Sequence, residues 1–87
     1  GYGTRIILML FDFIFKDKKL NSLDAINCIR WDTMLENARA QHVYESKIGA
    51  IKTEVVENAW KDQMGVWRTA VNYEITREAF YALHSDL

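Results

Sequence analysis

Val66-Trp67-Arg68-Thr69-Ala70-Val71-Asn72-Tyr73-Glu74-Ile75 is the stretch whose secondary structure decides the fold class. With a period of two, its β-favouring side chains alternate between two faces, as in a strand. With a period of 3.6, it continues a longer apolar stripe along one helix face, which predicts a helix because the match is longer. The residues of that stripe are Val56, Trp60, Met64, Trp67, Val71, Ile75, Ala79 and Ala82.

Two stripes that precede this stretch also follow the helical period. The first, behind the N-cap residue Ser22, comprises Leu23, Ile26, Ile29, Trp31, Met34, Leu35 and Ala38. The second comprises Tyr44, Ile48, Ile51, Val55 and Ala59. The chain has no proline, and after residue 3 it has only two glycines, Gly49 and Gly65, whereas a β-rich fold needs several tight turns. We therefore expect an all-α bundle of three to four helices, with Thr76 as N-cap of a short last helix. The alternative is an α+β fold with strands near residues 5–15 and 66–75.

The run Ile6–Phe15 has nine apolar residues in ten. It is much shorter than the roughly 20 residues that cross a bilayer as a helix. The charged residues 16–19 stand where a signal peptide would have a small-residue cleavage site. We therefore expect a cytoplasmic protein with no membrane association. The run predicts a buried segment that also packs against a partner, because a short chain has few elements to cover it on all sides.

The 87 residues predict a single domain spanning 1–87, with a folded surface of roughly 5,300 Å². The segment Gly1-Tyr2-Gly3 has no apolar pattern that would pack it into a core, so we expect residues 1–8 to include part of a tag remnant. A lone cysteine, Cys28, excludes an internal disulfide. The formal charge of −1 argues against binding to nucleic acid.

Two alternatives involve other ligands. Glu54 and Glu57 lie one helical turn apart, a spacing that resembles the Mg²⁺-binding carboxylates of the all-helical nucleotide pyrophosphohydrolases. The facing pair would be Glu74 and Glu78, although Arg77 occupies the position of an expected acid. This resemblance implies Mg²⁺-dependent nucleotide binding or hydrolysis. The other alternative is a nucleic-acid-binding module, in which aromatic residues of an exposed strand at 66–75 stack on bases.

No complete acid–base, nucleophile or metal-ligand set occurs in the sequence, so we expect no catalytic residue, metal or cofactor. Eleven aromatic residues are more than a chain of this size can bury, and tryptophan and methionine are enriched at interface centres. We therefore predict a small non-enzymatic interaction protein, an inhibitor, adaptor or assembly factor of phage or bacterial type, that forms a homo-oligomer, with a dimer favoured. The predicted interface residues are Trp31, Trp60, Met64, Trp67, Val71, Ile75, Phe11 and Phe13.

Overall fold

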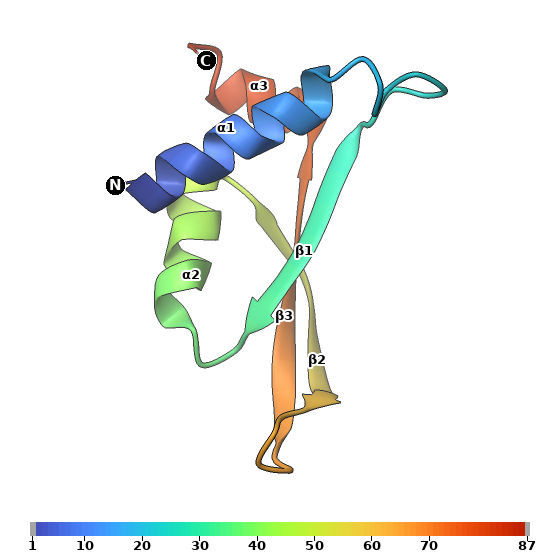
Figure 1. Ribbon diagram of the computed structural model, residues 1–87. Coiled ribbons are helices and arrows are strands. Elements are labelled where there is room, and N and C mark those ends of the chain that lie inside the picture. Colours follow the sequence, from blue (N-terminus) through green and yellow to red (C-terminus); the bar gives the residue numbers. More distant parts are fainter. Residues whose placement is uncertain (1, 87) are drawn as a thin grey trace.

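The computed structural model describes residues 2–86 and shows an α+β fold (Figure 1). Three strands form an antiparallel sheet: β1 (Cys28–Met34), β2 (Ile51–Lys61) and β3 (Trp67–Thr76). Their order in the sheet is β1-β3-β2, so the last strand in the chain lies in the centre. The prediction of an all-α bundle is therefore wrong.

Helices cover one face of the sheet. They are α1 (Tyr2–Lys16), α2 (Ala38–His42) with the π-helical segment η1 (Val43–Ile48) that continues it, and α3 (Arg77–Leu83). Side chains from α1, η1 and α3 meet the inner face of β3 in one core. Its buried residues are Phe11, Phe15, Ile48, Ala50, Val71, Tyr73, Ile75 and Phe80.

The period of two, rather than the longer helical match, describes residues 66–75. Val71, Tyr73 and Ile75 alternate along β3 and point into the core, each no more than 2% exposed. The backbone of β3 pairs with β1 on one edge and with β2 on the other. Because β3 is paired on both edges, the N–H and C=O groups of its buried backbone form hydrogen bonds. The number of apolar residues at helical spacing does not include this contribution of the neighbouring strands.

The two preceding helical stripes were also predicted wrongly. Residues 28–34 form β1, where Trp31 lies opposite Tyr73, and Leu23 lies in a loop with 97% of its surface exposed. The second stripe is divided between η1 and β2 at Gly49. Long-range strand pairing overrides local periodicity here, because strand preference depends mainly on the neighbouring strands.

The N-terminal run is a helix, so the alternative that placed a strand near residues 5–15 is wrong at that position. Phe11 and Phe15 of α1 are buried against the sheet and α3. Residues 2–8 form the first turns of α1, whereas Gly1 lies outside the described residues. The predicted cap of the last helix is confirmed, since the Thr76 hydroxyl accepts a hydrogen bond from the backbone N–H of Ala79.

The chain forms its tight turns with few glycines because Gly49 and Gly65 stand where the backbone needs a positive φ, and an aspartate side chain stabilises the hairpin turn. Gly49 ends η1 with φ 88°, and Gly65 has φ 81° in the β2–β3 hairpin. In the same hairpin, one Asp62 carboxylate oxygen accepts the backbone N–H groups of Met64 and Val66, each at 2.9 Å. Scarcity of turn signals was therefore a poor argument against strands.

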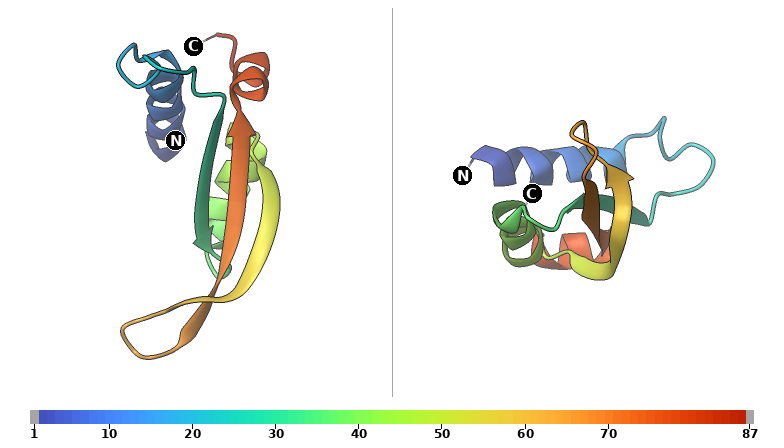
Figure 2. Two further views of the ribbon diagram at one scale, coloured as in Figure 1. Left: turned by 90° about the vertical axis from the view of Figure 1, so that its right-hand side faces the viewer. Right: turned by 90° about the horizontal axis from the view of Figure 1, so that it is seen from below.

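The molecule is extended for its mass, with principal dimensions of 41 × 31 × 20 Å. The β2–β3 hairpin projects away from the helices as a long arm (Figure 2). The accessible surface is 6437 Å², well above the roughly 5,300 Å² expected for a compact chain of this size. Among residues 2–86, no helix combines the length and the apolar composition needed to span a bilayer.

Candidate functional site

A cavity of about 620 Å³ lies between the first two turns of α1 and the α2–η1 segment. The residues that line it come from two parts of the chain that are far apart in sequence. They are Tyr2, Gly3, Thr4 and Ile7 of α1, then Asn37, Arg39, Ala40, Val43, Tyr44 and Lys47.

Local hydrogen bonds fix the α2 side of this cavity. The Asn37 side-chain oxygen accepts the backbone N–H of Ala40 at 3.1 Å and caps α2. The Gln41 side-chain amide donates to the carbonyl of Leu35 at 2.6 Å, which holds α2 against the end of β1. An asparagine before a helix is a frequent N-cap because its side chain satisfies a free N–H of the first turn.

Tyr44 is held in the cavity wall by aromatic neighbours. Its ring centroid lies 5.3 Å from that of Trp31 and 5.3 Å from that of Tyr73, both in edge-to-face geometry. The Tyr73 hydroxyl donates a 2.9 Å hydrogen bond to the Glu45 carboxylate. Burial, together with this carboxylate, raises the pKa of Tyr73 to about 12. The indole N–H of Trp31 is buried and has no hydrogen-bond partner among the described residues.

The charge of the cavity favours an anion. Its lining contains two basic residues, Arg39 and Lys47, and among the described residues it contains no carboxylate. The first turn of α1, which faces the cavity, also has no acidic residue. The first N–H groups of a helix have no intrahelical partner, and they carry partial positive charge. Ile7 and Val43 add apolar surface beside these positive groups.

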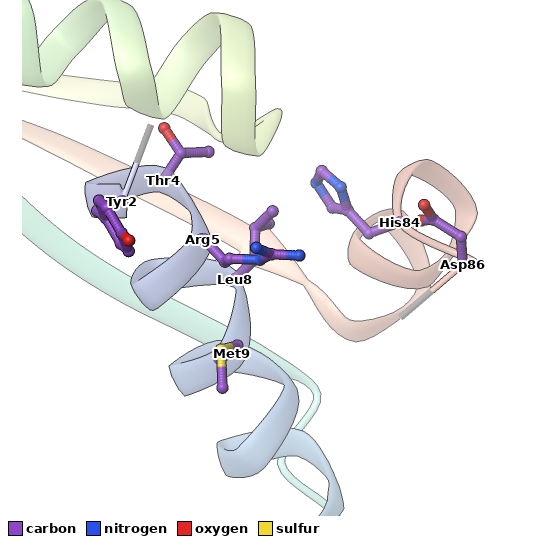
Figure 3. Close-up of a pocket in the computed structure, with 7 residues that line it drawn as sticks. All are labelled: Tyr2, Thr4, Arg5, Leu8, Met9, His84 and Asp86. Carbon is purple, nitrogen blue, oxygen red and sulfur yellow. The ribbon is translucent and has the colours of Figure 1, made fainter.

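A second cavity, of about 610 Å³, lies on the other side of the α1 start (Figure 3). Tyr2 and Thr4 line both cavities, and Arg5 extends from α1 toward the C-terminal segment. In that segment, His84 Nε2 lies 2.8 Å from the carbonyl oxygen of Ile48. A carbonyl only accepts, so this nitrogen carries the proton and ties the end of α3 to the end of η1.

The structure does not bring the four predicted magnesium ligands together. Glu54 and Glu57 lie on β2, which is a strand, so their helical spacing has no meaning there. Glu74 of β3 accepts hydrogen bonds from the Cys28 thiol and the Arg30 guanidinium, which lower its pKa, while Glu78 lies on α3. Residues 2–86 contain no group of three or more His, Cys, Asp or Glu side chains placed to hold a metal ion.

The predicted interface residues fall into two groups. Phe11, Val71 and Ile75 are buried in the core of the chain itself, and Trp31 is half-buried beside them. The others are exposed on α1 or on the hairpin arm: Phe13 (57%), Trp60 (41%), Met64 (86%) and Trp67 (55%).

Sequence reasoning missed the cavity residues Asn37, Arg39, Tyr44 and Lys47. The available signal was the change of apolar phase near residues 40–44, together with the N-cap character of Asn37. These features predict the start of a helix and a change of element near residue 40. They do not predict that the start of α1 lies beside that helix and completes the cavity.

No protein-family model matches this chain, and no curated protein matches it. Solved structures do match. The spermidine/spermine N-acetyltransferase SpeG of Vibrio cholerae, in mutant forms, is 18% identical, with a TM-score of 0.79 over 97% of this chain and 46% of that chain. The spermidine N-acetyltransferase of the same organism in complex with CoA and spermine is 19% identical, with a TM-score of 0.76 over 92% of this chain and 43% of that one. A form of SpeG with manganese ions matches over all of this chain and 45% of that one, at 18% identity and a TM-score of 0.75.

The matches show that this chain has the fold of part of an acetyltransferase. They contradict the prediction of a helical bundle, and also that of a non-enzymatic interaction protein, because the fold is shared with enzymes. The chain spans less than half the length of each structure that it matches.

Proposed function

We propose that this chain is the CoA-binding part of an N-acetyltransferase, which transfers an acyl group from CoA to an amine. The electropositive cavity between α1 and α2–η1 carries the proposal. The shared fold supports it, since one matched structure is that of an N-acetyltransferase in complex with CoA and spermine. The acceptor class is therefore an amine, with polyamines as the first candidates.

The residues that line the cavity fit CoA. Its phosphates need positive charge, which Arg39, Lys47 and the free N–H groups at the start of α1 provide. Its pantetheine arm is long and largely uncharged, and it suits the apolar surface of Ile7 and Val43. When bound, acyl-CoA supplies an acyl group that is activated as a thioester.

Two tyrosines, Tyr2 and Tyr44, line this cavity, and Tyr44 is the better suited to move a proton because it is half-buried, whereas Tyr2 is 87% exposed. The hydroxyls of Tyr73 and Tyr81 are occupied, since each donates to a carboxylate. No hydrogen bond joins the Tyr44 hydroxyl to another group within residues 2–86, and its ring lines the cavity. We assign Tyr44 Oη the delivery of a proton to the group that leaves during acyl transfer.

Calorimetric titration of the chain with CoA tests the cavity. Arg39→Gln and Lys47→Gln should each weaken binding by about fivefold, because each removes about 1 kcal/mol of interaction with phosphate. Lys52→Gln is the matched control, since Lys52 carries the same charge on exposed β2, away from the cavity. Equal affinity for all three variants would exclude this cavity, and no binding of CoA to the wild-type chain would refute the function.

We also propose that the chain self-associates through the hairpin arm. Trp60, Met64 and Trp67 are exposed there, and large exposed aromatic residues are typical of interface centres. Light scattering at low micromolar concentration should give a dimer that Trp67→Asp converts to a monomer. A wild-type monomer would contradict the proposal.

A further inference from the structure

Tyr44 and Glu45 are neighbours in the chain, and one side chain of the sheet contacts both of them. The Tyr73 hydroxyl donates a 2.9 Å hydrogen bond to the Glu45 carboxylate. The Tyr73 ring also meets the Tyr44 ring edge to face, with centroids 5.3 Å apart. Strand β3 is therefore tied to two consecutive residues of η1, and the first of these lines the cavity.

Tyr73 is itself held firmly. It lies on the central strand, opposite Trp31 of β1 on one side and Lys52 of β2 on the other, and is only 1% exposed. Trp31 stacks on Tyr73 with centroids 6.0 Å apart and an interplanar angle of 22°, and it also meets Tyr44 edge to face. A close-packed side chain between paired strands has little freedom to move, so Tyr73 is a fixed point for the segment that it contacts.

The backbone of η1 is wound more loosely than an α-helix. The Tyr44 carbonyl accepts the N–H of Gly49 at 3.1 Å and that of Ala50 at 2.8 Å, whereas an α-helical carbonyl accepts from the residue four positions later. π-Helical turns are rare and occur frequently at functional sites. Because this turn lacks the ordinary pattern of backbone hydrogen bonds, the place of Tyr44 depends on side-chain contacts as well.

The hydrogen bond to Tyr73 is the polar contact that the Glu45 side chain makes within residues 2–86. None of the ion pairs in this part of the chain includes Glu45. A hydroxyl that donates to a carboxylate forms a charge-assisted bond, which is stronger than a bond between neutral groups. This bond connects the helical layer to the sheet directly beside Tyr44.

We propose that Glu45 and Tyr73 are positioning residues, whose hydrogen bond holds the turn of η1 that places the Tyr44 hydroxyl at the cavity. This inference rests on the proton delivery proposed for Tyr44. A general acid must lie within about 3 Å of the atom that it protonates, and a misplacement of about 1 Å slows a reaction strongly. Neither Glu45 nor Tyr73 lines the cavity, so both act through Tyr44.

The test follows the Tyr44 ring by NMR in the full chain with ¹³C-labelled tyrosine. The rings of Trp31 and Tyr73 lie against the Tyr44 ring, and their ring currents displace its signals from those of a tyrosine in water. Tyr2, which is 87% exposed, provides the internal reference for a solvated ring.

The variants change the acceptor of the hydrogen bond and leave every aromatic side chain in place. Glu45→Ala removes the acceptor, and it opens no cavity in the core because the Glu45 side chain is exposed. Glu45→Gln keeps an acceptor oxygen without the charge. Asp12→Ala is the matched control, since Asp12 also accepts a tyrosine hydroxyl, that of Tyr81 at 2.7 Å, but between α3 and α1.

We expect the Tyr44 signals to move toward those of Tyr2 in Glu45→Ala and to keep their wild-type positions in Glu45→Gln and Asp12→Ala. Unchanged Tyr44 signals in Glu45→Ala would overturn the proposal. An equal displacement in Asp12→Ala would also overturn it, because a general loosening of the fold would then be the cause.

Kinetics test whether the position matters to the reaction. In an enzyme that contains this chain, Glu45→Ala should lower kcat by about tenfold and change KM for acyl-CoA by less than about twofold. Added to Tyr44→Phe, it should lower kcat no further, because Glu45 acts through the Tyr44 hydroxyl. A wild-type kcat in Glu45→Ala, or the same tenfold loss on the Tyr44→Phe background, would contradict the proposal.

Failure of the proposed function gives a different result. The wild-type chain then does not bind CoA in the calorimeter, whereas the Tyr44 ring signals still move in Glu45→Ala. That combination would support the hold of Glu45 and Tyr73 on Tyr44 and refute only the part of Tyr44 in acyl transfer.

Discussion

Tyr44, Tyr73 and Tyr81 differ in what their hydroxyls contact, and this difference supports the role proposed for Tyr44. Tyr73 and Tyr81 donate to Glu45 and Asp12, whereas Tyr44 lines the cavity without a partner in residues 2–86. The sequence alone could not separate them, because tyrosine is equally suited to a core, an interface and a site of proton transfer. The structure separates them by the hydrogen bonds of Tyr73 and Tyr81 and by the place of Tyr44 in the cavity wall.

Tyr44→Phe keeps the ring and removes the proton. On the proposed function, kcat for acyl transfer to a polyamine, in an enzyme that contains this chain, should fall by about 100-fold, the lower range for loss of a general acid. The affinity for CoA, measured by calorimetry, should change by less than about twofold, because the hydroxyl is not needed for the phosphate contacts. A variant with wild-type kcat would remove Tyr44 from the reaction.

Tyr73→Phe tests the buried hydrogen bond to Glu45. Folding raises the pKa of Tyr73 to about 12, above its ordinary value of about 10. The folded state therefore holds this proton more tightly, and the stabilisation is complete below pH 10 and lost as pH rises to 12. The variant should lose about 1 kcal/mol at pH 7 and show a shallower decrease in unfolding free energy between pH 9 and pH 12.

Denaturant titrations across this pH range provide the measurement. Tyr81→Phe is a parallel test, since burial and the Asp12 carboxylate also raise the pKa of Tyr81 to about 12. Each variant should remove part of the decrease in unfolding free energy between pH 9 and pH 12. An unchanged slope in both would show that these tyrosines titrate normally in the folded chain.

At the scale of the elements, the helix ends were easier to predict than the strands. The N-cap at Thr76 depends on a residue and its near neighbours, and the structure confirms it. Strand β1 depends on β3, which lies some 40 residues later, and a periodicity count over residues 23–38 cannot include that pairing. The alternative prediction of a strand at 66–75 agrees with β3, but the strand that it placed at 5–15 is the helix α1. A continuous apolar run fits a buried strand and a buried helix equally well, so periodicity could not decide between them.

A glycine series tests the turn that ends η1. Gly49 has φ 88°, and a Cβ there would collide with the side chain of Leu83. Gly65 has φ 81°, and a Cβ there would make only an ordinary contact with the Lys61 side chain at 3.8 Å, whereas Gly3 lies in α1 with nothing within 4 Å. Gly49→Ala and Gly65→Ala should each destabilise by about 1 kcal/mol, because both glycines have a positive φ and the exposed Leu83 side chain can move away from an added Cβ. Gly3→Ala should be neutral or stabilising by up to about 1 kcal/mol. Thermal unfolding of the three variants gives these changes, and a Gly49→Ala variant as stable as the wild-type chain would contradict the positive φ at position 49.

At the scale of the whole molecule, the excess of exposed apolar surface was foreseeable from composition. The eleven aromatic residues and the apolar N-terminal run indicated more such surface than the chain can bury. Their distribution was not foreseeable, since Phe11 and Val71 lie in the core while Phe13 and Trp67 are exposed. The candidate site was also hidden, because it forms only where residues 2–7 and 37–47 come together.

Binding of CoA between α1 and α2–η1 is measured most directly by ¹H–¹⁵N NMR spectra of the chain during a titration with CoA. We predict saturable shift changes at the amides of residues 2–7 and 37–47, since these segments line the cavity. The amides of the β2–β3 hairpin, residues 51–76, should remain unchanged near its tip. Spectra that do not change with CoA at millimolar concentration, or changes confined to the hairpin, would contradict CoA binding at this site.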